Sequence, residues 1–273
     1  MENKKFGFIG SGKMAGAIIK GLIKTGFSKP ENIMATQAVD EAISVEEKSK
    51  ILGIKVILNN KELADWADVI FIATKPNQVS GVLEEITPFV TLEKLIVSIA
   101  AGVTTGKLAA NLPQNTRIIR VMPNTPALIG EGMSAMFGGN KATNQDLELI
   151  KQLLSTIGKC IIVDDEAQMD IVTAISGSGP AFFYKVINEI ARGGEKLGMD
   201  YEKALLLSIQ TAIGSAKMAL NREVSMEQLI ANVATKGGCT AVGVDCMDKY
   251  DTQKLFADVI GQTTHKAGEL GKN

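Results

Sequence analysis

Histidine and cysteine are scarce in this sequence. His265 is its only histidine, and its three cysteines, Cys160, Cys239 and Cys246, are widely spaced. One histidine cannot supply a multi-histidine metal site, and an odd, scattered set of cysteines fits neither a disulfide framework nor a zinc site. The sequence therefore predicts no metal centre, and its cysteine usage is typical of the reducing cytoplasm, where we expect the protein to act.

An excess of charge of either sign is also lacking. The 29 lysines and arginines are balanced by 30 acidic residues, which gives a formal net charge of -1. This balance points to neither nucleic acid nor an anionic membrane surface as a partner. No uninterrupted apolar stretch approaches the roughly 18 residues of a membrane span. The first residues hold no apolar segment of a secretory leader, so we expect none.

The sequence pattern changes after about Asp164. Before that point, short apolar runs such as 69–73 and 95–99 alternate with segments of helical periodicity. This alternation predicts βαβ units and a mostly parallel sheet. After it, helical periodicity predominates. The sequence therefore predicts an α/β fold: a Rossmann-type, mostly parallel sheet over 1–164, followed by an all-helical domain over 165–273.

The same patterns predict the individual elements of the first domain. The expected strands lie at 6–9, 32–36, 55–57, 69–73, 95–99, 117–121, 133–137 and 160–163. The expected helices lie at 14–25, 40–52 and 144–157. Runs that are apolar throughout are typical of strands buried on both faces of a sheet.

A glycine-rich loop follows the first expected strand and precedes the first expected helix. It reads Gly-x-Gly-x-x-Ala, in which Gly10 permits a tight turn, Gly12 lets backbone approach a pyrophosphate, and Ala15 allows close helix packing. The helix N-terminus then offers free N–H groups to the phosphates. The expected cofactor-binding residues of this loop are Gly10, Ser11, Gly12, Lys13 and Met14.

The end of the second expected strand bears on the choice between NADPH and NADH. Enzymes that use NAD usually place an acidic residue there to bind the ribose 2′-hydroxyl. This sequence has Thr36 and Gln37 instead, with neither an acid nor an arginine. The absence of a repelling acid favours NADPH, and the absence of an arginine leaves NADH open. We expect Thr36 and Gln37 to border the cofactor.

Two further strand ends are expected at the same edge of the sheet, where ligands bind in open α/β folds. The first carries the four residues Ala73, Thr74, Lys75 and Pro76. Lys75 would reach a ribose hydroxyl or carbonyl, and the alternative is a solvated loop lysine. The second, around Ala100, has small side chains that leave room for a nicotinamide ring; the alternative is close packing.

A second glycine-rich loop lies in the helical part of the chain. It reads Gly237-Gly238-Cys239-Thr240, and a helix is expected to start near Thr240. Converging backbone N–H groups and a helix N-terminus favour a small anion. A hydride carrier at one loop and a carboxylate-sized site at the other predict a dehydrogenase or reductase acting on a small acid.

Several motifs together resemble one family. They are Gly-Phe-Ile-Gly-Ser-Gly at 7–12, Thr-Lys-Pro at 74–76, Ser-Ile-Ala-Ala-Gly at 98–102, Arg-Val-Met-Pro-Asn-Thr-Pro at 120–126 and Thr-Ala-Ile-Ser-Gly-Ser-Gly-Pro-Ala at 173–181. In this order the sequence resembles pyrroline-5-carboxylate reductase. The resemblance implies reduction of the cyclic imine 1-pyrroline-5-carboxylate to L-proline with NADPH or NADH. It also implies a Rossmann dinucleotide-binding domain over 1–164 and a helical domain over 165–273 for substrate binding and oligomerisation. The helical domain would form a homodimer, with assembly of five dimers into a decamer left open.

The resemblance also implies roles for individual residues. Asn60 matches a contact to the adenosine side of the cofactor, and 73–76 match the strip along the nicotinamide ribose. The substrate-binding residues implied are Glu166, Gly237, Gly238, Cys239 and Thr240. Two departures stand out: Lys236 replaces a common proline, and Thr36-Gln37 replaces an Asn-Arg or Asp-Arg pair.

The chemistry needs a carboxylate anchor, a hydride donor and a polar group near the imine nitrogen. Thr240 is the expected catalytic residue, bonding either the ring nitrogen or the carboxylate, and no strong acid or base is obligatory. For Glu166 the alternative is an acid that stabilises a helix N-terminus. Two other functions stay open: a small-acid dehydrogenase that depends on Lys185, and a dinucleotide sensor without turnover.

Overall fold

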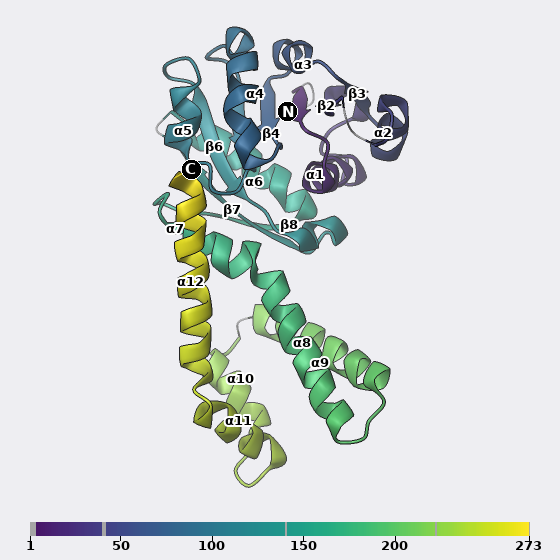
Figure 1. The fold of residues 1–273 in the computed structure, drawn as a ribbon, viewed down its shortest axis with the longest axis vertical. Helices are drawn as coiled ribbons and strands as arrows, with labels where there is room; N and C mark the ends of the chain where they lie inside the picture. Colours follow the sequence, from purple (N-terminus) through teal and green to yellow (C-terminus); the bar gives the residue numbers. More distant parts are fainter. Residues whose placement is uncertain (1–3, 40–41, 140, 222, 273) are drawn as a thin grey trace. The chain divides into compact units, whose positions relative to one another are not determined.

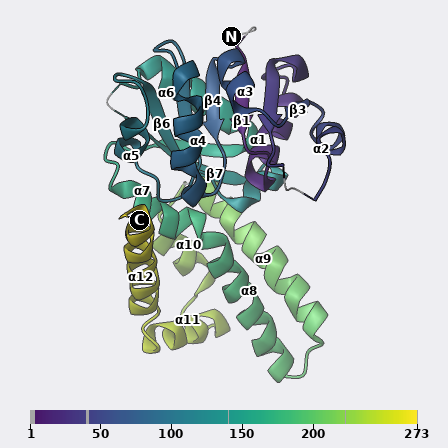
Figure 2. The same ribbon diagram turned by 45° about the horizontal axis from the view of Figure 1, so that its top comes forward.

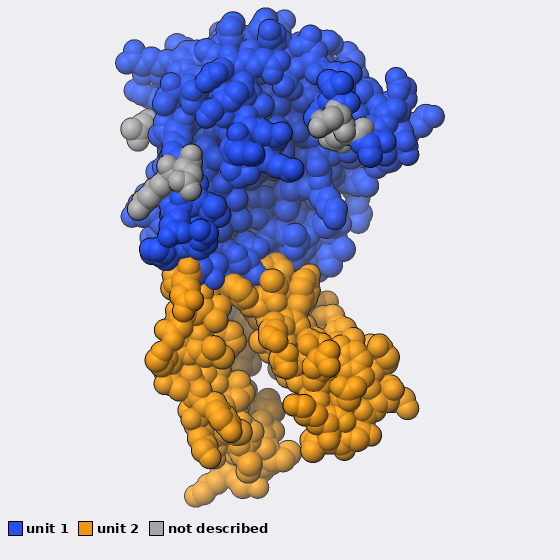
Figure 3. All heavy atoms as spheres, in the orientation of Figure 1, with its two compact units in different colours: residues 1–178, 263–273 blue, residues 179–262 orange. Residues whose placement is uncertain are grey.

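The computed structural model describes residues 4–39, 42–139, 141–221 and 223–272 (Figure 1). The chain divides into two compact units (Figure 3). Unit 1 comprises Met1–Ser178 and Thr263–Asn273, and unit 2 comprises Gly179–Gln262. The last helix therefore returns the chain to the unit in which it began.

Unit 1 is built on an eight-stranded sheet in the order β3-β2-β1-β4-β5-β6-β7-β8. The strands are β1 (Phe6–Ile9), β2 (Ile33–Thr36), β3 (Lys55–Ile57), β4 (Val69–Ile72), β5 (Leu95–Ser98), β6 (Arg117–Met122), β7 (Gly132–Gly138) and β8 (Gly158–Ile162). All neighbouring strands are parallel except β6 and β7. This confirms the predicted mostly parallel sheet, and the order reverses between β1 and β4, where such folds bind ligands.

The helices of unit 1 follow the strands along the chain. They are α1 (Lys13–Lys24), α2 (Val45–Leu52), α3 (Asn60–Trp66), α4 (Val79–Ile86), α5 (Thr105–Ala110), α6 (Asn144–Leu154) and α7 (Gln168–Val172), with the short helical turns η4 (Thr125–Ile129), η5 (Ser155–Ile157) and η6 (Thr173–Gly177). The start predicted for the second helix was wrong. It begins at Val45 because the Ser44 side chain caps it by accepting from Glu47 N; residues 40 and 41 lie outside the described part.

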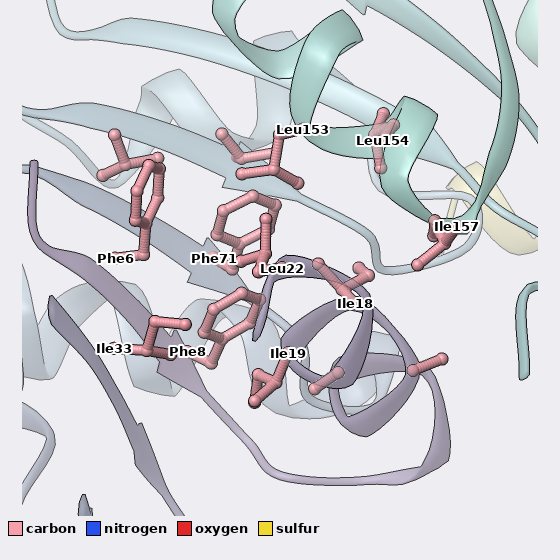
Figure 4. Packing of buried hydrophobic residues seen from close by; sticks show 14 of the residues in the cluster. Phe6, Phe8, Ile18, Ile19, Leu22, Ile33, Phe71, Leu153, Leu154 and Ile157 are labelled. Carbon is pink, nitrogen blue, oxygen red and sulfur yellow. The ribbon is translucent and has the colours of Figure 1, made fainter. Parts of the chain in front are cut away.

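Apolar side chains cover both faces of the sheet. On one face the rings of Phe8 and Phe71 stack with centroids 4.5 Å apart, and residues of α1 and α6 such as Leu22 and Leu153 pack in the same cluster (Figure 4). On the other face Ile70 and Ile96 pack with residues of α3 and α4. Burial on both faces explains why β1, β4 and β5 read as continuous apolar runs rather than alternating ones.

The start of β8 lies very close to the start of β7. Gly132 and Gly158 are paired in register, and Gly158 has a φ of +145°. A Cβ added to Gly158 would lie 2.0 Å from the carbonyl oxygen of Gly132. This pairing therefore requires a residue without a side chain at position 158.

The segment after Asp164 packs on the sheet of unit 1. Met169 of α7 is buried with Ala135 and Val163. The C-terminal end of α12 (Thr252–Lys272) also belongs to this unit, and a Cβ on Gly271 would lie 2.8 Å from the carbonyl oxygen of Gly102. The compact units thus divide at Gly179, whereas the domain boundary near Asp164 remains a prediction from sequence pattern.

Unit 2 is helical in its described residues. It holds α8 (Gly179–Lys196), α9 (Tyr201–Asn221), α10 (Met226–Val233), α11 (Cys239–Lys249) and the first part of α12. Helices α8 and α9 lie side by side (Figures 1 and 2), and the Tyr201 hydroxyl donates to Asn188 Oδ1 at 2.9 Å. None of the helices among the described residues has the length and apolar character needed to cross a membrane.

The helices of unit 2 leave large apolar side chains exposed. On α8, Phe183 and Ile190 lie seven residues apart and are 68% and 60% exposed, and Leu197, which is 90% exposed, follows at the same spacing just after the helix ends. On α9, Leu206, Ile213 and Leu220 are also seven residues apart, and all three are exposed. A seven-residue repeat keeps side chains on one face of a helix. Each helix of the α8–α9 pair therefore carries an apolar stripe that a single chain leaves exposed to solvent.

Candidate cofactor and substrate sites

The loop between β1 and α1 forms an open approach to a helix N-terminus. Gly10 has a φ of +100°, and a Cβ on it would lie 2.8 Å from the carbonyl oxygen of Ala73. Gly12 is the N-cap of α1, with no side-chain cap and no acidic residue in the first turn. A Cβ on Gly12 would meet no other described atom within 4 Å. This open, uncapped N-terminus suits an anion.

Three of the predicted cofactor residues come together at the end of β2. The Thr36 hydroxyl donates to Asn60 Oδ1 at 2.8 Å and accepts from Gly10 N at 3.3 Å. Asn60 in turn donates through Nδ2 to Glu85 Oε2 at 2.8 Å. These hydrogen bonds fix the shape of the loop that carries Gly10. Glu85 was missed by sequence reasoning, because its partner lies 25 residues away in the chain.

Gln37 is buried beside this group. It is only 6% exposed, and its Nε2 donates to the carbonyl oxygen of Ile43 at 2.9 Å. Its Oε1 is a buried atom without a hydrogen-bond partner. Gln37 therefore anchors the chain that leads into α2, and it brings no charge to the edge of the sheet.

The residues after β4 lie beside the glycine-rich loop. Ala73 N donates to the carbonyl oxygen of Ile9 at 2.9 Å, which ties this strand end to β1. The Thr74 hydroxyl is buried without a partner, whereas Lys75 is exposed and Pro76 begins a short helical turn. Ala100, after β5, is buried, and its N–H donates to Ser98 Oγ at 3.3 Å.

The edge of the sheet at β1 and β4 fits a dinucleotide. The hydroxyls of Ser11 and Thr74 are both buried and have no partner within the described chain. Buried polar groups of this kind normally find a hydrogen-bond partner. Together with the free α1 N-terminus and the open space at Gly12, they match the phosphate and hydroxyl groups of such a cofactor.

Glu166 lies in a cluster of charged residues in unit 1. Its two carboxylate oxygens accept from Thr105 N and Thr105 Oγ1, each at 2.7 Å. The buried Arg120 lies 3.3 Å from both Glu166 Oε1 and Asp170 Oδ1. The Glu166 carboxylate therefore neutralises an arginine inside a strand and joins the segment before α7 to α5 and β6, while Asp170 joins α7 itself to the same arginine. Arg120 is flanked by the apolar residues Ile119 and Val121 within β6, and a charged side chain in such a run is a sequence signal for a buried ion pair.

The second glycine-rich loop lies in unit 2 and ends in another uncapped helix N-terminus. Gly237 has a φ of +79°, and Gly238 N donates to the carbonyl oxygen of Thr235 at 2.9 Å. Helix α11 begins at Cys239, one residue before the predicted start, with Gly238 as N-cap and no acidic residue in its first turn. Cys239 is exposed and Thr240 is half-buried. This geometry suits a small anion such as a carboxylate.

Three other residues with titratable side chains, Cys160, Lys185 and His265, lie far from both glycine-rich loops in the sequence. Burial raises the pKa of the Cys160 thiol to about 11, so the thiol is protonated at neutral pH. Lys185 forms an exposed ion pair with Glu189 at 2.7 Å, and His265 lies 3.6 Å from Glu269. Nothing in these contacts favours a catalytic role for Lys185.

Comparison with known proteins gives a consistent result. The family model "Pyrroline-5-carboxylate reductase dimerisation" matches residues 166–270, and "NADP oxidoreductase coenzyme F420-dependent" matches residues 5–102. The chain is 38% identical to pyrroline-5-carboxylate reductase of Methanosarcina acetivorans, covering all of both chains. It is 35% identical to the Pseudomonas aeruginosa enzyme, covering all of this chain and 98% of that one.

Solved structures of this kind are also similar. A pyrroline-5-carboxylate reductase from Coxiella burnetii has a TM-score of 0.93 and 32% identity, with both chains fully covered. A Plasmodium falciparum pyrroline carboxylate reductase with NADP bound has a TM-score of 0.86 and 31% identity, with 99% of each chain covered. The likeness extends over both units and over both glycine-rich loops.

Proposed function

Because the chain belongs to the pyrroline-5-carboxylate reductase family, we propose that its two uncapped helix N-termini hold the two anions of that family's reaction. The N-terminus of α1 takes the cofactor pyrophosphate, and the N-terminus of α11 takes the substrate carboxylate. The protein is an NAD(P)H-dependent oxidoreductase that reduces the C=N bond of 1-pyrroline-5-carboxylate to give L-proline. The pair of free N-termini is the observation that carries the assignment of these roles.

The cofactor, when bound, supplies the hydride. We assign its pyrophosphate to the backbone of Gly10, Ser11, Gly12, Lys13 and Met14. Asn60, held by Thr36, borders the adenosine, and residues 73–76 border the nicotinamide ribose. Ala100 leaves room for the ring. The buried unpartnered hydroxyls of Ser11 and Thr74 support this path along the edge of the sheet.

The substrate carboxylate is bound by the backbone N–H groups of Cys239 and Thr240, with Gly237 and Gly238 shaping the turn before them. The Thr240 hydroxyl bonds the ring nitrogen or the carboxylate and so orients the imine carbon toward the hydride donor. Orientation and fixed dipoles can supply much of the rate, so no strong acid or base is required. Glu166, in unit 1, is proposed as a further substrate-binding residue. Its hydrogen bonds to Thr105, the first residue of α5, favour the alternative that it stabilises a helix N-terminus.

Replacing Thr240 with valine is expected to lower kcat/KM for 1-pyrroline-5-carboxylate by roughly 10- to 100-fold, because a hydrogen bond to a charged group is lost. The measurement is the fall in nicotinamide absorbance with NADPH and NADH in parallel, with proline determined as product. Cys246→Ala, at an exposed position on the same helix, is the control and should match the wild type. Full activity of Thr240→Val would contradict the assignment of this site.

The exposed apolar stripes of unit 2 lie within the segment that matches a dimerisation family model. We propose that a second copy of the chain covers the stripes on α8 and α9 in a homodimer. The three free cysteines support a cytoplasmic location. A decamer of five such dimers is the larger assembly that we propose to test for.

Replacing Ile190 with glutamate is expected to convert the dimer into a monomer at micromolar concentration, because a charge would be buried in an apolar interface. Light scattering gives the mass, and it also reveals whether the wild type forms a decamer. Lys185→Ala, at an exposed position on the same helix, is the control for helix α8. An Ile190→Glu variant with the wild-type mass would refute the proposed interface.

The Lys185→Ala variant also tests the alternative function. Loss of activity in this variant would favour a lysine-dependent dehydrogenase mechanism.

A further inference from the structure

A cavity of about 550 Å³ lies beside the glycine-rich loop of unit 1. Residues of α1, α2, η4 and η5 line it, together with Ser11 and Gly12. Its lining includes Lys13, Lys20 and Lys24 of α1 and Lys48 of α2, and none of the described residues that line it is acidic. The lining of this cavity is therefore positively charged, and it includes Ser11 and Gly12 of the proposed pyrophosphate site.

Lys48 differs from the other three lysines in its surroundings. Its Nζ lies 3.4 Å from the carbonyl oxygen of Ser11, and the residue is half-buried, whereas Lys13, Lys20 and Lys24 are exposed. Ser11 is 4% exposed, and its hydroxyl is one of the buried groups without a partner. The ammonium group of Lys48 therefore contacts the backbone of Ser11, the residue whose buried hydroxyl has no hydrogen-bond partner.

The end of β2 carries no positively charged side chain for a 2′-phosphate, and Lys48 can supply one. NADPH differs from NADH by a phosphate on the adenosine ribose, and a positively charged side chain near the end of the second strand usually binds it. Here the Thr36 hydroxyl is bonded to Asn60, and Gln37 is bonded to Ile43. Neither residue carries a charge. The bond between Gln37 and Ile43 instead fixes the chain that enters α2, one turn before Lys48.

We infer that Lys48 and Ser11 bind the 2′-phosphate of NADPH and make this cofactor preferred over NADH. The ammonium group of Lys48 supplies the charge, and the Ser11 hydroxyl donates a hydrogen bond. The inference rests on the proposed cofactor site at the α1 N-terminus. The choice between NADPH and NADH is therefore assigned to a residue of α2, whereas Rossmann-type folds usually make this choice at the end of β2.

Calorimetric titration of the full-length protein tests this with two fragments, 2′,5′-ADP and 5′-AMP, which share the adenosine but differ in the 2′-phosphate. Lys48→Gln is expected to weaken binding of 2′,5′-ADP by about tenfold or more and to leave 5′-AMP unchanged. Lys20→Gln, farther along the same cavity, should leave both affinities unchanged. Lys48→Arg should retain the preference, and the NADPH-to-NADH ratio of kcat/KM should follow the binding data.

The outcomes separate the inference from its premise. Equal weakening of both fragments by Lys48→Gln, unchanged binding of both, or an equal loss in Lys20→Gln would overturn the role of Lys48. Wild-type protein that binds neither fragment would overturn the cofactor site itself. Selective loss of 2′,5′-ADP binding in Lys48→Gln supports the inference even where turnover of the imine is absent, because the measurement involves no reaction. Circular dichroism of each variant verifies that it is folded.

Discussion

Gly158→Ala is expected to lower the free energy of unfolding by about 3 kcal/mol or more. The added Cβ would lie 2.0 Å from the carbonyl oxygen and 2.5 Å from the nitrogen of Gly132. Both atoms belong to the backbone of a paired strand, so they cannot rotate away as a side-chain end could. The φ of +145° adds a conformational cost for any residue with a Cβ. Equilibrium denaturation in urea measures the change.

Gly81→Ala is the matched control for this substitution. Gly81 lies inside α4, and a Cβ there would meet no other described atom within 4 Å. Alanine is the better helix former by roughly 1 kcal/mol, so this variant should be as stable as the wild type or more so. Equal denaturation midpoints for Gly158→Ala and the wild type would show that β7 and β8 separate at little cost, contrary to the pairing seen here.

Gly12→Val is expected to weaken NADPH binding by about 100-fold or more while leaving the fold nearly unchanged. The φ of −69° and ψ of −175° at Gly12 are accessible to any residue, and a Cβ would meet open space. The isopropyl group would instead occupy the space that the proposed pyrophosphate needs, and it would remove the close approach to the free N–H groups of α1. Fluorescence titration with NADPH measures the affinity, and thermal denaturation measures the stability.

Gly10→Ala gives the comparison that identifies the cause. Its Cβ would lie 2.8 Å from the carbonyl oxygen of Ala73, and its φ of +100° is unfavourable for alanine. This variant should lose stability and cofactor affinity together. Gly12→Val should lose affinity alone. Normal NADPH binding by Gly12→Val would mean that the cofactor does not pass over this glycine.

The sheet was largely predictable because its strands are local signals. The strands at 6–9 and 55–57 have the predicted bounds, and the other strands differ by a few residues at their ends. Burial on both faces makes each central strand an apolar run that needs no partner to be recognised. The start of α2 was mispredicted because the cap at Ser44, and not helical periodicity, determines where it begins.

The candidate sites were predictable only where they are formed by residues that are close together in the sequence. A glycine-rich turn followed by a helix is visible in sequence, and both loops have the expected local geometry. The partners of Glu166 were not visible, since Arg120 and Thr105 lie 46 and 61 residues away. The approach of Lys48 to Ser11 likewise depends on how α2 folds back, across 37 residues.

The return of α12 to unit 1 limits how the two units can be exchanged between related proteins to make a chimera. Residues 263–272 belong to the same compact unit as residues 4–178, and the tight approach of Gly271 to Gly102 joins the two parts of that unit. Unit 2 is thus inserted in the sequence of unit 1. A chimera that takes its cofactor-binding unit from one parent must also take the last turns of α12 from that parent. A single crossover between residues 178 and 263 would take residues 4–178 from one parent and the end of α12 from the other, and so would pair surfaces of unit 1 from different parents.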